Sequence, residues 1–453
     1  MNQKQKEKRK VIMARSIALG HCVCDPAKPC PCPLFKEKDV CQCAGEKLPL
    51  EIDGEIKLTD YVKSAGCASK IGKKDLYDIL SGVPAIDDDR VLVGSNAGDD
   101  AGVILLSEDD THAHILTVDV FAPSVDDPYT FGQIAAANSV SDVYAMGGKP
   151  QAALSIVGFP VEILANDVMR DILRGGIEKM KEAGVPVVGG HSIKDGEIKC
   201  GFAVLGTCPK DGFVRNSGAK VGDIMILTKP LGVGITAFAG QIGHATPENL
   251  AKVAESMSTL NKDAAEVMVT NDVHAATDIT GYSLLGHLAE IVKNSEVEVE
   301  IDFEKIPLFE NVAKFAREEI LPGAVERNRE SVSEEVLDLS KLADAQKNIL
   351  FSPETSGGLL MFIPPGNAEK TLEELHKRGV SSASVIGKVT EKNKKGLITV
   401  TTECKDDYSY IKPVKKNIPI PRQEEPCCCC EEEEHSEQSC CSENKEDEEC
   451  CYS

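Results

Sequence analysis

The chain has 453 residues, of which 42% are hydrophobic and 27% are charged, a composition that predicts a globular protein of about two domains. Its 73 acidic and 50 basic residues give a net charge of -23, which disfavours a nucleic acid as partner. No apolar run approaches the roughly 20 residues that span a bilayer. We therefore expect a cytoplasmic protein with no membrane partner.

Cysteines concentrate near the two ends of the chain. Six of the 18 cysteines form three C-x-C pairs within residues 22–43, and eight lie within residues 427–453, beside ten acidic residues and one lysine. The other four are spread between them: Cys67, Cys200, Cys208 and Cys404. The folded body is therefore not a disulfide scaffold. We expect residues 1–49 to form a flexible Cys-rich extension and residues 414–453 a disordered acidic tail.

Thiolates are soft ligands, so the N-terminal C-x-C pairs suggest a structural Zn²⁺ or iron–sulfur site. C-x-C spacing is less diagnostic than C-x-x-C, and an extension without metal stays an equal alternative. For the tail we expect a thiol-rich segment that collects soft metal or chalcogen.

Between these arms, strands alternate with amphipathic helices, as in α/β or α+β proteins. The first half predicts strands at residues 90–94, 102–106, 114–121, 152–159, 185–190 and 200–206. Helices are predicted over 130–146 and 164–183, the second with Val168, Ile172, Ile177 and Met180 on one face.

The second half begins after a polar stretch at residues 212–222, where we place the boundary between domains 50–215 and 216–413. It predicts a helix after Gly281 and strands at residues 221–230, 274–277, 359–364 and 383–389.

Acidic residues gather at the ends of these strands. Asp99 and Asp100 lie between two strands, Asp119 ends a third, and Asp278 follows the strand at 274–277. The helix at 130–146 adds Asn138 and Asp142, one turn apart within an apolar stripe. Such carboxylates and an amide form a hard-cation site for Mg²⁺, which also binds substrate phosphates. A buried network satisfied by hydrogen bonds is the alternative.

Phosphate contacts need backbone or side-chain donors as well. The chain has no P-loop and no strand-linked G-x-G-x-x-G, so the candidate phosphate-binding turns are residues 189–192 and 355–358. Plain turns are the alternative, and the commoner use of such glycines. Ahead of the acidic residues, a loop of small residues carries Cys67 and Lys70, and a nearby ammonium lowers the pKa of a thiol.

These segments together resemble the selenophosphate synthetases (selenide, water dikinases) of the aminoimidazole ribonucleotide synthetase-like superfamily. The matching stretches are AGCASK, GDDAGV, TVDVF, FGQIAAANSVSDVYAMGGKP, VVGGHS, TDITGYSLLGH and PETSGGLL, in the family's order over nearly all of residues 56–400. The loop with Cys67 and Lys70, together with TDITGYSLLGH, distinguishes the selenium enzyme from its superfamily.

The resemblance implies a two-domain α+β fold, a homodimer formed through the N-terminal domains, and synthesis of selenophosphate, AMP and phosphate from selenide, ATP and water. It implies that Cys67 and Lys70 are catalytic and that Asp100, Asp142 and Asp278 hold Mg²⁺. The implied nucleotide-binding residues are Lys70, Ala97, Gly98, Asp99, Asp119, Asn138, Asp142, Gly190, His191 and Ser192. A selenium-delivery protein is a further expected partner.

Two alternatives remain open. One is another ATP enzyme of the superfamily, such as a hydrogenase-maturation dehydratase, an aminoimidazole ribonucleotide synthetase or a thiamine-phosphate kinase; Cys67 and Lys70 argue against it. The other is a non-catalytic metal- or selenium-binding protein, which the intact acidic set disfavours. The chain also departs from many members of the family by carrying Ser69 where they have a second Cys.

Overall fold

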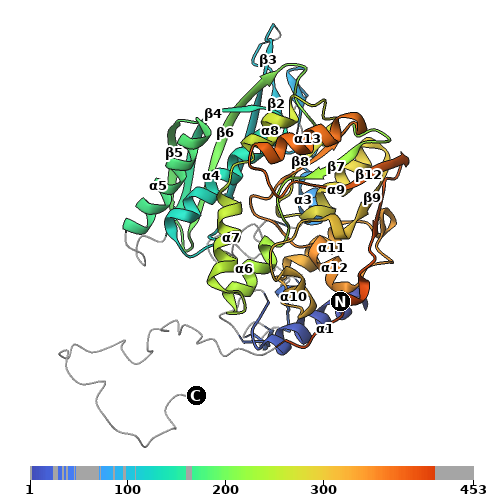
Figure 1. Ribbon diagram of the computed structural model, residues 1–453. Helices are drawn as coiled ribbons and strands as arrows, with labels where there is room; N and C mark the ends of the chain where they lie inside the picture. Colours follow the sequence, from blue (N-terminus) through green and yellow to red (C-terminus); the bar gives the residue numbers. More distant parts are fainter. Residues whose placement is uncertain are drawn as a thin grey trace, which may run out of the picture. The chain divides into compact units, whose positions relative to one another are not determined.

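Figure 1 shows the computed structural model, in which helices pack on two β-sheets. The structure describes residues 3–23, 29–32, 35–36, 39–44, 46, 71, 73–84, 87–94, 98–107, 109–159 and 166–413. None of the helices within these ranges is long and apolar enough to cross a membrane.

The first sheet has six strands in the order β1-β2-β3-β6-β4-β5. Its strands are β1 (Val91–Val93), β2 (Gly102–Ile104), β3 (His112–Phe121), β6 (Lys199–Pro209), β4 (Lys149–Phe159) and β5 (Val187–Lys194). Neighbours are antiparallel except β4 and β5, which run parallel and are joined by helix α5 (Asn166–Ala183). Because parallel strands need a crossover, this helix returns the chain to the same end of the sheet.

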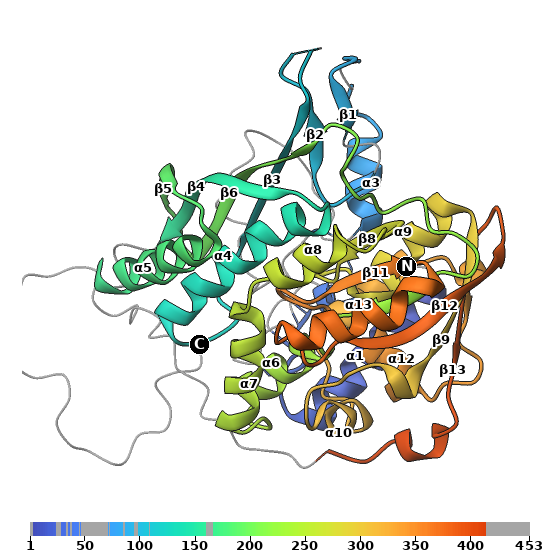
Figure 2. The same cartoon turned by 45° about the horizontal axis from the view of Figure 1, so that its top comes forward.

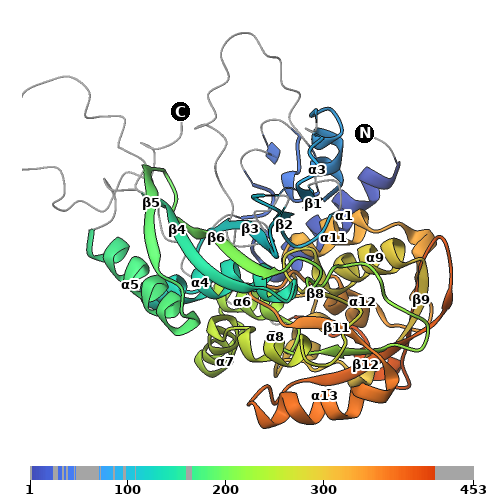
Figure 3. The ribbon, with the colours of Figure 1, turned by 90° about the horizontal axis from the view of Figure 1, so that it is seen from above.

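Helices α4 (Pro128–Ala145) and α5 cover one face of this sheet, as Figure 3 shows. Asp127 caps α4 by accepting the backbone N–H of Thr130 at 2.7 Å. α4 also contacts β8, α7 and α8 of the second half (Figure 2), so it lies between the two sheets.

The predicted apolar face of α5 is partly wrong. Ile172 and Met180 are buried as expected, whereas Ile177 is 48% exposed. Gly175 and Gly176 are buried instead. A Cβ on Gly175 would lie 1.9 Å from the backbone oxygen of Tyr129 in α4, so no larger residue fits at this position. The two helices therefore pack closer than larger side chains would allow.

The second sheet has seven strands in the order β10-β13-β9-β12-β7-β11-β8. They are β10 (Leu337–Asp338), β13 (Leu397–Thr401), β9 (Val297–Asp302), β12 (Ser384–Lys392), β7 (Ile224–Leu227), β11 (Leu359–Ile363) and β8 (Ala275–Asp278). β13 pairs in parallel with β10 and β9, and the other pairs are antiparallel. Alternate residues of β11 enter two different hydrophobic clusters, so this strand is covered on both faces.

The helices around this sheet are α6 (Val233–Gln241), α7 (Pro247–Ser258), α8 (Lys262–Met268), α9 (Ser283–Ser295), α10 (Val312–Arg317), α11 (Ala324–Ser331), α12 (Asp344–Leu350) and α13 (Pro365–Lys377). Short 3₁₀ segments are η5 (Phe303–Lys305), η6 (Glu334–Val336) and η7 (Lys405–Tyr408).

The N-terminal extension contains helix α1 (Gln3–Leu19) and the 3₁₀ segment η1 (Gln42–Ala44), and α3 (Lys73–Leu80) precedes the first sheet. Ile12 and Leu19 of α1 are buried and join the core of the second half. Residues 3–19 are thus a packed helix and not the flexible arm expected of them, because their buried residues recur at helical spacing.

The α+β fold with two sheets confirms the predicted fold class, and each predicted strand is present. The prediction missed β9, β10 and β13, although the alternation VEVEID in β9 is a period-two pattern.

Candidate active site

Three carboxylates from both halves of the chain act on a fourth, Asp142, where α4 meets the two sheets. Asp119 lies on β3, Asp142 on α4 and Asp278 at the end of β8, whereas Asp100 lies just before β2. Burial, followed by the negative charges of Asp278, Asp119 and Asp100, raises the pKa of Asp142 well above its ordinary value. Acids from distant parts of the sequence therefore share one electrostatic environment.

Two threonines orient these acids. The hydroxyl of Thr117, two residues before Asp119 on β3, donates to a carboxylate oxygen of Asp142. Thr277 donates to Asp100 Oδ1 at 2.6 Å. Sequence reasoning missed both threonines, although each lies beside a predicted acid on a predicted strand.

Asn138 links α4 to both halves of the chain. Its Nδ2 donates to Asp119 Oδ2 at 2.6 Å, and its Oδ1 accepts the backbone N–H of Ser356 at 2.8 Å. The side chain is fully buried. Both ends of the amide are therefore satisfied, and its orientation is fixed by one acceptor and one donor.

The turn at residues 355–358 is buried, in contrast to the open phosphate cradle expected there. The backbone N–H of Ser356 is already used by Asn138, and that of Leu359 donates to Thr228 Oγ1 at 2.8 Å. A Cβ on Gly357 would lie 2.1 Å from the carbonyl oxygen of Ile279. Its glycines therefore allow close packing rather than access to solvent.

The predicted turn at residues 189–192 is instead part of β5, the edge strand of the first sheet. Gly190, His191 and Ser192 are exposed and pair in parallel with β4. A Cβ on Gly190 would lie 2.2 Å from Ser155 Oγ, so this glycine lets the two strands approach. β6 and β4 separate these residues from β3, which carries Asp119.

The turn before Asp100 is tied to the segment between the sheets. Asp99 Oδ1 accepts the backbone N–H of Asn216 at 2.9 Å, and Asn216 Nδ2 donates to the carbonyl of Gly98 at 2.6 Å. Burial raises the pKa of Asp99. Asp99 thus supports the turn through hydrogen bonds.

Three predicted site residues, Cys67, Lys70 and Ala97, lie outside the described residues. Ile71, which follows Lys70, is described, and its carbonyl oxygen accepts the hydroxyl of Tyr282 at 3.4 Å. Tyr282 lies four residues after Asp278, so the chain just past Lys70 meets the loop that follows this acid.

Lys229 lies near Asp278 and was not among the predicted site residues. Its Nζ donates to the carbonyls of Ser256, Thr259 and Ser356 at 3.0, 2.7 and 2.9 Å. Burial lowers the pKa of Lys229 to about 7, while the charge of Asp278 opposes that fall. A buried amine therefore lies within electrostatic reach of the acidic group.

The acidic group has the oxygen chemistry that Mg²⁺ prefers, and a cation would relieve the repulsion that raises the pKa of Asp142. Within the described ranges, however, no three His, Cys, Asp or Glu side chains lie close enough to hold a metal ion by themselves. Mg²⁺ commonly takes one or two carboxylates together with substrate phosphates and water. The donor set therefore fits Mg²⁺ that arrives with a nucleotide better than a cage formed by protein alone.

The N-terminal cysteines that the structure describes lie together near the end of α1. Cys43 is held in a disulfide, and the thiol of Cys22 lies 3.2 Å from its sulfur. Burial raises the pKa values of Cys30 and Cys41, and neighbouring cysteines raise them further. Among the residues that the structure describes, no group can hold a metal, so the predicted Zn²⁺ or iron–sulfur site gains no support.

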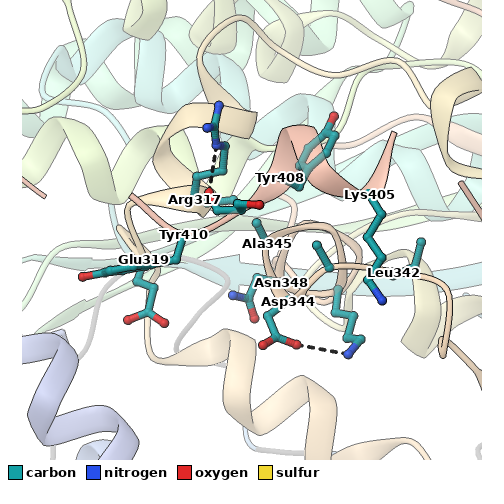
Figure 4. A pocket seen from close by; sticks show the side chains of 13 residues that line it. Arg317, Glu319, Leu342, Asp344, Ala345, Asn348, Lys405, Tyr408 and Tyr410 are labelled. Carbon is teal, nitrogen blue, oxygen red and sulfur yellow. Dashed lines mark hydrogen bonds and ion pairs between the residues drawn. The ribbon is translucent and has the colours of Figure 1, made fainter. Parts of the chain in front are cut away.

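A cavity of about 420 Å³ lies apart from the acidic residues, beside α10, α12 and η7 (Figure 4). Its polar groups are largely engaged: Arg317 Nε donates to the carbonyl of Ser409 at 3.0 Å, and Lys347 pairs with Asp344 at 3.0 Å. We assign it no part in the reaction.

The two domains that these sheets form match the AIR synthase-related proteins. Residues 98–208 match the family described as AIR synthase related protein, N-terminal domain, and residues 220–400 match its C-terminal domain. Thiamine monophosphate kinase from Aquifex aeolicus shares the fold, with a TM-score of 0.51 and 19% identity over 76% of this chain and 98% of that one. HypE from E. coli, a hydrogenase maturation protein, does so with a TM-score of 0.51 and 17% identity over 77% and 98%.

Sequence similarity narrows this class to one family. The selenide, water dikinase of Carboxydothermus hydrogenoformans is 45% identical over 76% of this chain and 98% of its own length. Those of Pelobacter propionicus and Clostridioides difficile are 42% and 43% identical over 97% and 98% of their lengths. The chain belongs to the selenide, water dikinase family.

Proposed function

We propose that this protein makes selenophosphate from selenide, ATP and water and releases AMP and phosphate. The observation that carries the proposal is the group of acids around Asp142, held by Thr117, Thr277 and Asn138, in a chain that spans nearly the whole length of selenide, water dikinases. The acids are Asp100, Asp119, Asp142 and Asp278. The other enzymes of the fold are similar at only 17–20% identity, which supports a common fold and no common substrate.

In this proposal Asp100, Asp142 and Asp278 hold Mg²⁺ together with the triphosphate. The bound metal neutralises phosphate charge during transfer. Thr117 and Thr277 hold the carboxylates of Asp142 and Asp100 in position. Asp119, kept in place by Asn138, faces the same group and completes the nucleotide site with Gly98 and Asp99.

Gly190, His191 and Ser192 stay proposed nucleotide contacts on the strength of the family resemblance alone. They are exposed on β5 and accessible to a ligand, but a nucleotide would have to reach past β4 and β6 to contact them as well as Asp119. Substituting His191 by Ala and measuring ATP affinity tests this assignment separately from the acidic residues.

In this proposal, Cys67 and Lys70 carry the reactive side chains of the loop that precedes the acidic residues. A thiolate at Cys67 handles selenium, and the ammonium of Lys70 stabilises charge on the transferred phosphate. Cys67→Ser should abolish selenide-dependent turnover and Lys70→Ala should nearly do so, whereas Ser69→Cys should be tolerated. Wild-type rates in either of the first two variants would remove that residue from the mechanism.

A homodimer through the first sheet belongs to the same proposal. Leu116, Val118, Leu154 and Leu205 are exposed on the face of this sheet opposite α4 and α5. Leu116 and Leu205 are direct cross-strand partners, so the apolar surface is continuous. An apolar face of this kind marks a protein interface.

The test is to incubate the purified protein with ATP, Mg²⁺ and selenide and to follow AMP. We expect AMP only when selenide is present. AMP formation that does not depend on selenide, or phosphorylation of thiamine monophosphate, would favour another enzyme of the fold. A cytoplasmic location and delivery of selenium by a partner protein stay predictions.

A further inference from the structure

Helix α11 holds two loops of the proposed active site at once. Asn328 Nδ2 donates to the carbonyl oxygens of Gly281 and Phe351, each at 3.0 Å. Gly281 lies three residues after Asp278, and Phe351 immediately precedes the buried loop at residues 352–358. Because Asn328 is itself buried, both of its bonds are shielded from water.

The two loops are also bonded to each other and to α4. The backbone N–H of Glu354 donates to the carbonyl of Thr280 at 3.1 Å, and that of Ile279 donates to Gly358 at 2.9 Å. Ser356 donates to Asn138, which in turn holds Asp119. A shift of α11 would therefore displace the backbone on both sides of the acidic residues.

Helix α1 packs against α11 from the N-terminal extension. Arg15 Nη2 donates to Glu326 Oε1 at 2.8 Å, and these residues are 3% and 6% exposed. Lys8 pairs with Glu330 at 2.7 Å one turn further along α11. Ile12 and Leu19 lie on the same face of α1 and enter the hydrophobic cluster that includes Val325 of α11.

The ion pair between α1 and α11 is costly to break from one side. Arg15 Nε and Nη1 and Glu326 Oε2 are buried and make no hydrogen bond. The hydrogen bond between the two groups joins two buried charges, and the guanidinium of Arg327 is a second positive charge that acts on Glu326. Removing Arg15 therefore takes away the one hydrogen bond between the helices at this point and leaves a buried carboxylate with less compensation. Replacing both by apolar side chains avoids that cost.

We propose that α1 is a positioning element for the active site: it fixes α11 through Arg15 and Glu326, and α11 fixes the two site loops through Asn328. The residues that match the AIR synthase-related domains begin at 98, so α1 lies outside them. The effect on turnover rests on the proposed function, whereas the effect on loop order does not.

The experiment compares amide hydrogen exchange and ATP turnover in the full-length protein, its Arg15→Met variant and the Arg15→Met/Glu326→Leu double variant. In Arg15→Met we expect exchange at residues 279–282 and 352–358 to accelerate at least tenfold, while α5, which is distant from α11 in the first half, stays as in the wild type. Selenide-dependent kcat/KM for ATP should fall at least fivefold. The double variant should recover part of both losses, because apolar side chains then replace Arg15 and Glu326, whereas Arg327 loses the negative charge of Glu326.

Lys4→Ala is the matched control, since Lys4 lies on the same helix and pairs with Glu334 at 3.7 Å while both side chains are exposed. It should change neither quantity. If Arg15→Met does not fold, Asn328→Ala tests the second link, because it should accelerate exchange in the same two loops without loosening α1.

Wild-type exchange in both loops of Arg15→Met, with faster exchange in α1 alone, would overturn the proposal, since α1 would then dock without positioning anything. Wild-type exchange in both loops of Asn328→Ala would overturn it equally. Absence of AMP formation by the wild type would instead reject the proposed function and leave the exchange comparison to decide this inference.

Discussion

The two sheets differ in how their faces are covered. In the second sheet, successive residues of β11 enter opposite hydrophobic clusters, so its centre is buried on both faces. In the first sheet, α4 and α5 cover one face, while Leu116, Val118 and Leu205 are exposed on the other. The second sheet therefore buries its central apolar residues within the chain, whereas the first leaves several of its apolar side chains exposed.

This difference assigns the sheets different tasks. β8 and the loops beside it are held between packed layers, which suits a strand that ends in Asp278 and must keep a carboxylate in place. The first sheet contributes Asp119 through its covered face, and in the proposed dimer its open face is the surface of association. The predictions below are given from the largest expected effect to the smallest, and the first two test this division directly.

Asp278→Asn should reduce selenide-dependent AMP formation on the order of 1000-fold, because metal-assisted charge stabilisation accounts for several kcal/mol of a phosphoryl-transfer barrier. The fold should persist, since the change removes one of several repelling charges near Asp142. Steady-state kinetics and thermal melting measure the two effects. Asp167→Asn, at an exposed ion pair on α5, is the control that should leave both unchanged. Turnover within a few-fold of wild type would remove Asp278 from the site.

Val118→Asp should dissociate the proposed dimer, because each copy would bring a carboxylate to the centre of an apolar interface. Val118 is 57% exposed, so the monomer itself should fold normally. We expect the dissociation constant to rise on the order of 100-fold. Light scattering across a dilution series measures it, with Ile177→Asp on the outer side of α5 as control. A wild-type chain that is monomeric at all concentrations would contradict the role given to the open face.

Glu354→Gln should destabilise the second half by about 1–3 kcal/mol, because the amide would turn its NH₂ group toward the backbone N–H of Gly232 or Val233, where a carboxyl oxygen of Glu354 now accepts. It should also change the pH dependence of stability. Burial raises the folded-state pKa of Glu354 to about 8, so its contribution is present below its unfolded pKa and lost as pH rises through 8.

The wild type should therefore lose stability relative to Glu354→Gln between about pH 4.5 and pH 8. Denaturant unfolding of both proteins across this range checks the sign. If the difference in unfolding free energy between the two proteins stays constant over this pH range, Glu354 is ionised throughout it, and its two N–H donors keep it so.

Deleting residues 427–453 should have the smallest effect on the enzyme. The segment has eight cysteines and ten acidic residues but few apolar side chains to bury, so thermal stability and turnover at saturating selenide should stay within about twofold. Bound soft metal or selenium should fall, because eight thiols are lost together. Collapse of turnover on truncation would instead give the tail a structural role.

Local patterns in the sequence predicted much of this fold. Apolar runs and alternation located the strands that carry Asp119 and Asp278, and helical spacing paired Asn138 with Asp142. The roles of these residues stay predictions, although their mutual electrostatic influence agrees with a shared site. The glycines of residues 189–192 were misinterpreted, because a glycine pair suits a turn as well as a close approach of two strands.

Other features depend on contacts that no local pattern reveals. Arg15 and Glu326 are 311 positions apart, and the two carbonyls that Asn328 holds belong to separate loops. Lys229 is a single charged residue near the end of an apolar segment, and nothing in that segment indicates the three backbone carbonyls around it. Such residues are recognised only once the chain is folded.

The most direct test of the central claim is a phosphorus NMR spectrum of the reaction with ATP, Mg²⁺ and selenide enriched in ⁷⁷Se. We predict a new phosphorus signal split by coupling to selenium, with AMP and phosphate appearing at the same rate. Conversion of ATP without any selenium-coupled phosphorus signal would contradict the assignment of this chain as a selenophosphate-forming enzyme.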